Sequence, residues 1–97
     1  MAHCLVTCIL KRGGHYNPHE RISHIGNSQS GWLVTEDSAI RRIETGMDSF
    51  YTLVNGRQAN IIVAVHNGRK YLKTDADGHA PNNLLALSDC NDCKLVD

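Results

Sequence analysis

The chain has 97 residues, of which 41% are hydrophobic and 21% charged, a balance typical of one folded domain rather than of a disordered chain. Ten basic residues offset ten acidic residues, so the formal net charge is zero and no global field attracts nucleic acid or a membrane surface. The longest apolar run, residues 61–65, is far shorter than the about 20 residues of a membrane span. Because the N-terminus lacks the pattern of a secretion signal, we expect a single cytoplasmic domain over residues 1–97.

The first third of the chain has the pattern of strands separated by turns. Residues 4–11 alternate in a run that is rich in β-branched side chains and apolar on both faces, which predicts one strand inside a sheet. A loop containing glycine and proline follows over residues 13–18. We then expect a short strand over residues 21–25, a polar turn over 27–31 and an extended piece over 32–34.

One helix is predicted over residues 36–45. Thr35 can accept a backbone N–H as the N-cap, and the next two residues are acidic, which suits the positive end of the helix dipole. Gly46 fits the left-handed position just after the helix. A helix of about three turns is not stable alone. We therefore expect it to dock an apolar stripe on a sheet, namely Ala39, Ile40 and Ile43.

Strands are also predicted over residues 50–54, 59–66 and 69–74. Asn67-Gly68 is the strongest turn signal, because both central positions of a two-residue hairpin turn need positive φ. The resulting register pairs Val63 with Leu72 and assigns one face to the core, consisting of Ile61, Val63, Val65 and Leu72. The opposite face is mixed apolar, basic and aromatic, and it consists of Ile62, Ala64, His66, Arg69, Tyr71 and Lys73.

The tail from residue 75 is rich in turn residues, and a single helical turn near Leu84 is expected to lay leucines across an open end of the core. The predicted fold class is therefore α+β. It has an antiparallel sheet of four to five strands, one helix packed on one face and a short C-terminal helical flap. The second sheet face is left for solvent, for the flap or for association.

Residues 71–87 carry a resemblance to a known family. The run Tyr-Leu-Lys-Thr-Asp-Ala-Asp-Gly-His-Ala-Pro-Asn-Asn-Leu-Leu-Ala-Leu resembles the C-terminal signature of domain-of-unknown-function family 3892, small and mostly bacterial proteins. The first strand and the helix are similar to it as well, so the resemblance covers about residues 4–90. The chain departs from it at Leu87-Ser88, where members often continue Leu-Pro, and in the cysteine-containing ending. The resemblance implies a fold and a bacterial source, with no activity, cofactor or site residue to carry over.

Cys90 and Cys93 have the spacing of a zinc knuckle, but a closed tetrahedral site needs two more ligands. Only Cys4 or Cys8, His3 and the loop histidines can supply them, namely His15, His19 and His24. Because no second Cys-x-x-Cys is present, ordinary thiols are preferred and no cofactor is expected. Cys4 and Cys8 would lie about 13 Å apart on one strand, too far for a mutual disulfide.

The cysteines also allow two redox alternatives. A thioredoxin-like role for Cys90 and Cys93 is disfavoured, because acidic residues flank both thiols and no helix begins there. A disulfide between the first strand and the tail is an alternative for an oxidising compartment, and the lack of a secretion signal argues against it.

The remaining patterns do not indicate an enzyme. The histidines lack the i, i+4 spacing of a zincin, and the sequence has no Gly-x-Ser-x-Gly motif or phosphate-binding glycine loop. Histidines of the loop over residues 13–24 are interpreted as solvated, and His66 as a surface residue at the hairpin end.

The favoured function is a non-catalytic interaction module that binds a protein partner or a second copy through the mixed hairpin face. One alternative is weak binding of RNA or single-stranded DNA through Arg69, Tyr71 and Lys73, since residues 57–73 carry four basic residues and no acid. Another alternative is a small zinc-binding domain that uses Cys90 and Cys93. No membrane partner is expected.

Overall fold

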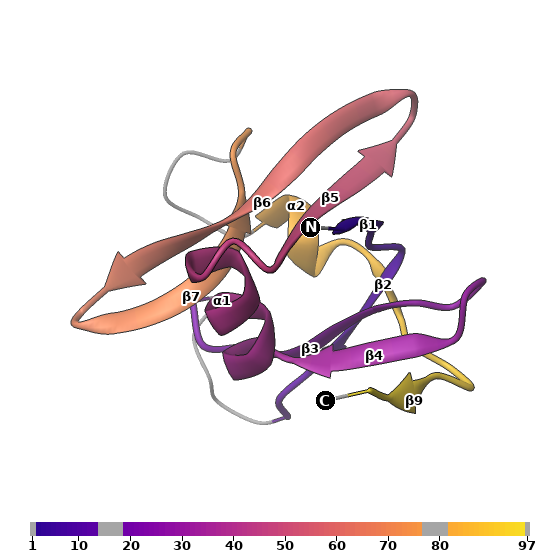
Figure 1. Cartoon of the computed structure of the whole chain (residues 1–97), viewed down its shortest axis with the longest axis horizontal. Helices are drawn as coiled ribbons and strands as arrows, with labels where there is room; N and C mark the ends of the chain where they lie inside the picture. The colour runs from indigo at the N-terminus through magenta and orange to yellow at the C-terminus, as the bar shows by residue number, and fades with distance from the viewer. Residues whose placement is uncertain (1, 14–18, 77–81, 97) are drawn as a thin grey trace.

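Two mixed β-sheets and one substantial helix make up the part of the chain that the computed structural model describes, residues 2–13, 19–76 and 82–96 (Figure 1). The four-stranded sheet has the order β1 (Ala2–Leu5), β5 (Asp48–Val54), β6 (Arg57–His66) and β7 (Arg69–Thr74). The five-stranded sheet has the order β8 (Ser88–Asp89), β2 (Cys8–Lys11), β3 (Ile22–Asn27), β4 (Trp32–Thr35) and β9 (Lys94–Leu95). The helices are α1 (Glu36–Glu44) and α2 (Asn82–Leu85).

The prediction of strands with one substantial helix is confirmed, but the single antiparallel sheet was wrong. There are two sheets, and both contain parallel pairs: β1 with β5, β2 with β8, and β4 with β9. Each parallel pair involves a strand of only two to four residues. Strands that short have no measurable periodicity, so the sequence pattern gave no sign of them.

The prediction of one strand over residues 4–11 was also wrong. The chain changes sheets in the middle of this run, where the Val6 amide donates to the Tyr51 carbonyl at 2.8 Å and the Thr7 amide donates to the Gly26 carbonyl at 2.9 Å. β1 therefore belongs to the four-stranded sheet and β2 to the five-stranded sheet. A chain that stays extended through such a change keeps its alternation of side chains, so periodicity does not reveal the change.

Helix α1 begins and ends close to where the sequence predicts. The Ser38 amide donates to the Thr35 hydroxyl at 3.1 Å, which confirms the N-cap, and Gly46 has a φ of +73°. Ala39 and Ile40 are buried, and Ile43 is partly buried against the core. The apolar stripe therefore docks as expected, and α1 packs against strands of both sheets (Figure 1).

The β6–β7 hairpin has the predicted register. Asn67 and Gly68 have φ values of +52° and +77°, as a two-residue turn with both central positions left-handed requires. Val63 pairs with Leu72, and Ala64 pairs with Tyr71.

The predicted exposure of this hairpin was wrong at three positions. Val65, expected in the core, is 65% exposed, because this end of the hairpin extends past the core. Tyr71 and Lys73, expected on an open face, are only 2% and 7% exposed. Part of the reason is His19, whose ring lies edge-on to the Tyr71 ring at a centroid distance of 4.8 Å. Both faces of β7 are therefore covered over residues 71–74.

One hydrophobic cluster joins both sheets and both helices, and it consists of Val6, Ile9, Ile22, Ile25, Val34, Ala39, Ile40, Phe50, Ile61, Leu72 and Leu84. The burial of Leu84 in α2 confirms the predicted flap. The expected loop over residues 13–18 lies outside the described residues except for Gly13. Among the described residues, no helix combines the length and the apolar character that a membrane crossing needs.

Candidate functional site

The predicted hairpin face is occupied by other parts of the chain. His19, expected in solvent, stacks on His66 with ring centroids 3.8 Å apart. The Lys73 ammonium donates to the Thr74 carbonyl at 3.3 Å and is buried. The other members of the face are half-buried, namely Ile62, Ala64, His66 and Arg69. An open aromatic and basic platform for nucleic acid is therefore not present at Tyr71 and Lys73, and a binding role of the other four residues stays a prediction.

Arg69 takes part in an ion-pair network around the first residue of α1. Its guanidinium contacts Glu36 Oε1 at 2.7 Å, and Arg12 contacts the same oxygen at 3.4 Å. Glu36 is 2% exposed, and among the described residues its Oε2 atom has no hydrogen-bond partner. Burial raises the pKa of the Glu36 carboxyl, while the hydrogen bonds and charges of Arg69 and Arg12 oppose that rise.

The two arginines also hold the chain that precedes β3. Arg12 donates to the Glu20 and Ile22 carbonyls, both at 2.6 Å, and Arg69 donates to the His19 carbonyl at 3.1 Å. These contacts join residues 19–22, the start of α1 and the β6–β7 hairpin. The network therefore helps to build the fold, and it engages the guanidinium of Arg69, whose side chain stays 36% exposed.

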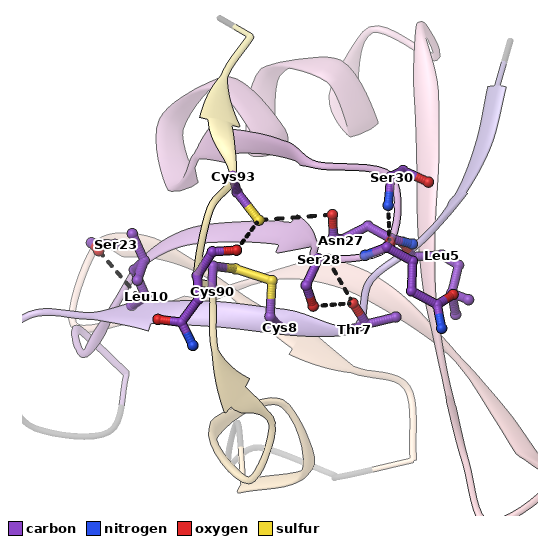
Figure 2. Close-up of a disulfide and its surroundings, with 12 residues drawn as sticks. Leu5, Thr7, Cys8, Leu10, Ser23, Asn27, Ser28, Ser30, Cys90 and Cys93 are labelled. Atoms are coloured by element: carbon purple, nitrogen blue, oxygen red, sulfur yellow. Dashed lines mark hydrogen bonds between the residues drawn. A yellow bond between two sulfur atoms is a disulfide. The ribbon is translucent and has the colours of Figure 1, made fainter.

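A second group of predicted residues does come together. Cys8 and Cys90 form a disulfide whose Cα atoms are 4.9 Å apart, and the Cys93 sulfur lies beside it (Figure 2). The three sulfur atoms all lie within 4.8 Å of one another. We call these three residues the three-sulfur cluster. It combines two bonded sulfurs with a third, partly buried free thiol.

The C-terminal tail, residues 88–96, positions two of the three sulfurs. It pairs with β2 through β8, and the Cys90 amide donates to the Ile9 carbonyl at 3.0 Å. It then crosses the sheet and pairs with β4 through β9, where the Lys94 amide donates to the Gly31 carbonyl at 2.8 Å. The tail therefore covers both edges of the β2–β3–β4 sheet, and the cluster lies at its crossing.

The crossing passes over β3 at Gly26 and Asn27. A Cβ atom at Gly26 would lie 2.6 Å from the Trp32 carbonyl oxygen and 3.1 Å from the Cys90 sulfur, so only glycine fits there. The Cys93 thiol donates to the Asn27 carbonyl at 3.8 Å, a contact drawn in Figure 2. An isolated glycine inside a strand indicates close approach of another group. That signal could have identified Gly26 from the sequence.

The cysteine predictions have mixed outcomes. Cys90 and Cys93 lie close together. Cys8 and Cys90 form a disulfide, so the expectation that they are ordinary thiols was wrong. The argument against a disulfide between the first strand and the tail was wrong for the same reason. Cys4 is a free thiol in the other sheet, where burial and the charge of Asp48 raise its pKa.

The predicted histidine ligands do not complete a metal site in the described chain, since the cluster contains no histidine. His24 lies in β3, where burial and the Arg12 charge lower its pKa, and His15 lies outside the described residues.

Comparison with known proteins identifies a family. A family model described as a protein of unknown function, DUF3892, matches residues 6–88. No curated protein and no solved structure matches the chain. The matched region contains Cys8 and Gly26 but ends before Cys90 and Cys93.

Proposed function

Because this chain belongs to the DUF3892 family, whose function is unknown, we propose a function from its own geometry: a redox-responsive interaction module. In this proposal, thiol–disulfide chemistry at the three-sulfur cluster attaches or releases the C-terminal tail. The observation that carries it is the Cys93 thiol beside the Cys8–Cys90 disulfide, at the crossing of a segment that covers two sheet edges.

The tail depends on the disulfide because its other attachments are small. β8 and β9 each contribute two residue pairs. Both strands are exposed, so little apolar burial adds to their pairing. Short exposed edge strands open easily without further support. Reduction of the disulfide therefore weakens the tail far more than it weakens the rest of the fold.

Cys93 provides a route that needs no external reductant. Its thiolate attacks the Cys90 sulfur, the Cys90–Cys93 bond forms, and the Cys8–Cys90 bond breaks. Cys8 leaves as a thiolate and takes up the proton that Cys93 lost, so the exchange has no net oxidation. With a dithiol reductant, the dithiol supplies two electrons and two protons and becomes a disulfide itself. Either reaction separates the tail from β2.

Release of the tail supplies the interaction surface. The outer edges of β2 and β4 then present unpaired N–H and C=O groups, which are templates for a strand of another chain. A second copy of this chain carries the same edges, so we expect the released form to self-associate. The interaction surface in this proposal is the pair of edges of β2 and β4, whereas the sequence pattern favoured the face of the β6–β7 hairpin. It also fits the expected cytoplasmic location, where disulfides are mostly transient or redox-sensing.

Hydrogen exchange tests the release. The oxidised chain and the chain reduced with dithiothreitol are compared in buffer containing EDTA. The amides of Cys90, Lys94 and Val96 donate to β2 and to the Gly31–Leu33 segment, and their exchange should accelerate about tenfold or more on reduction. Amides in the β6–β7 hairpin serve as the internal reference, and their exchange should accelerate less than that of the tail amides. Unchanged tail protection in a chain whose Cys8–Cys90 bond is shown to be broken would refute the proposal.

Two further measurements separate exchange from release. Peptide mapping after rapid acid quench should find a fraction of chains with Cys90 bonded to Cys93, and none in the Cys93→Ser variant. Sedimentation should show concentration-dependent association of the reduced chain and not of the oxidised chain. Cys4→Ser is the matched control, since Cys4 is a second free thiol outside the cluster. The proposal applies to this chain rather than to its whole family, because Cys90 and Cys93 lie beyond the matched residues.

A further inference from the structure

We infer that the three-sulfur cluster, once reduced, is a binding site for one Zn²⁺ ion held by the thiolates of Cys8, Cys90 and Cys93. This inference rests on the proposed function in one respect, because the Cys8–Cys90 disulfide must be reducible in the folded chain. It assigns a metal ion to the cluster, and it gives the tail a second means of attachment to β2.

The spacing of the sulfurs suits a zinc ion. Zinc–thiolate bonds of about 2.3 Å in a tetrahedron place neighbouring sulfurs about 3.8 Å apart. The three sulfurs already lie within 4.8 Å of one another. After reduction, the sulfur atoms of Cys8 and Cys90 must move apart. Rotation of the two side chains achieves this, because the Cα atoms are already 4.9 Å apart. No large change of the backbone is needed.

While the tail is docked, backbone contacts that do not involve sulfur hold the three ligands near one another. Residue Cys8 belongs to β2, which pairs with β3 over its whole length. The Cys90 amide bonds to the Ile9 carbonyl, and the Lys94 amide bonds to the Gly31 carbonyl. Between them, Asp92 has a φ of +57°, which turns the chain so that the Cys93 sulfur approaches the other two. The docked tail thus presents all three ligands to an ion, and a bound ion holds the tail in this docked position.

The donor set selects the class of metal. Three thiolates favour soft or borderline ions such as zinc over magnesium or calcium, which prefer oxygen. Binding releases three thiol protons, so affinity falls as the pH is lowered. Three protein ligands leave the fourth position of a tetrahedral ion open to an external group. Catalytic zinc sites have the same arrangement, with water or substrate in the fourth position.

Zinc would attach the tail in the reduced chain as the disulfide does in the oxidised chain. Cys8 comes from β2 and the other two ligands from the tail, so one ion joins the same two segments. Release of the tail by reduction then also requires the absence of zinc. For this reason, the exchange experiment above contains EDTA.

Metal titration of the full chain tests the inference. The chain is reduced anaerobically with a phosphine, the reductant is removed, and thiols are counted before any metal is added. The oxidised chain should show two thiols, Cys4 and Cys93, and the reduced chain all four of its cysteines. Co²⁺ should then give thiolate-to-cobalt charge-transfer absorption and tetrahedral d–d bands at one ion per chain. Zn²⁺ should displace it, and the oxidised chain should give no bands.

Variants identify the ligands. Cys93→Ser should lower zinc affinity by more than about 100-fold, beyond what loss of an outer contact causes. Its fold is verified in the oxidised state, where it keeps the Cys8–Cys90 disulfide. Cys4→Ser should bind as the wild type does. Equal affinity in Cys93→Ser, or loss of binding in Cys4→Ser, would overturn the three-thiolate site.

The thiol count separates the two possible failures. Four thiols without metal binding would overturn the zinc inference and leave the redox proposal intact. Two thiols in a folded chain under strong reductant would show that the disulfide is not reducible, and both proposals would fail.

Discussion

In the four-stranded sheet, β6 and β7 pair through six consecutive residue pairs, whereas β8 and β9 join the five-stranded sheet through two pairs each. The hairpin closes locally around Asn67-Gly68, and its inner positions Ile61 and Leu72 are buried. The tail returns from a sequence separation of 82 residues and is exposed along both short strands. Closing a long loop costs more entropy than closing a hairpin, so the tail needs a covalent bond where the hairpin does not.

The comparison indicates where each part of the fold derives its stability. Backbone pairing and apolar burial hold the hairpin, and sulfur chemistry holds the tail. Substitutions in the two regions should therefore differ in their response to reductant, and the first two predictions below test that difference.

Loss of the disulfide should have the largest effect. A bond that closes a loop of this length stabilises the folded state by about 4 kcal/mol in the loop-entropy model. The paired variant Cys8→Ala with Cys90→Ala should therefore lower the free energy of unfolding by roughly that amount, measured by urea denaturation without reductant. In the presence of reductant and EDTA, the difference from wild type should nearly vanish. A Cys4→Ser chain should behave as the wild type in both buffers, and a large difference that persists under reductant would contradict the assignment.

Leu72→Ala should cost about 3 kcal/mol, because it empties a fully buried position of the hairpin. The matched control is Val65→Ala at an exposed position on the same hairpin face, which should change stability by less than about 0.5 kcal/mol. Both differences should be the same with and without reductant. Similar losses for the two variants would show that Val65 is buried in solution, as the sequence pattern first suggested.

Gly26→Ala should cost about 2 kcal/mol, because the new methyl group meets the Trp32 carbonyl and the Cys90 sulfur. Hydrogen exchange should place the effect in the tail and in the β3–β4 ladder rather than in the hairpin. Gly13→Ala is the control, since no atom of the described residues other than Gly13 and its chain neighbours lies within 4 Å of a Cβ built there. Normal tail protection in Gly26→Ala would mean that the crossing has more room than the structure shows.

The smallest expected effect, on the order of 1 kcal/mol, is a change of pH dependence in Glu36→Gln. Because the pKa of Glu36 is raised in the folded state, its contribution to stability is fully present below its ordinary value of 4.5 and is lost as the pH rises through the raised value. The wild type should therefore lose more stability than the variant between about pH 4 and pH 7. Denaturant unfolding across that range measures the difference, and parallel curves would refute a raised pKa.

The sequence predicted what is local and missed what is distant. The N-cap at Thr35, the turn at Asn67-Gly68 and the Val63–Leu72 pairing follow from rules that act within a few residues, and all three are confirmed. The change of sheet after β1 could not be predicted, because alternation continues through it. Tyr71 is buried by a residue 52 positions earlier in the chain, His19, and no periodicity encodes such a contact.

The candidate site shows the same division. The Cys90 and Cys93 spacing identified two of the three sulfurs, but it did not identify Cys8 as their neighbour. That neighbour is set by the parallel pairing of β8 with β2, which is two residue pairs long. The argument from compartment also misled, because it weighed against a disulfide between the first strand and the tail, and the structure contains one between Cys8 and Cys90.

The bond between Cys8 and Cys90 turns nearly the whole polypeptide into a covalent ring. A protease that cuts once inside this ring leaves a single species of unchanged mass, apart from one added water, while the bond is intact. The same nicked molecule separates into two fragments when the bond is broken. A single cut between Cys8 and Cys90 is therefore hidden on a non-reducing gel while the bond is intact and becomes visible once the bond is broken.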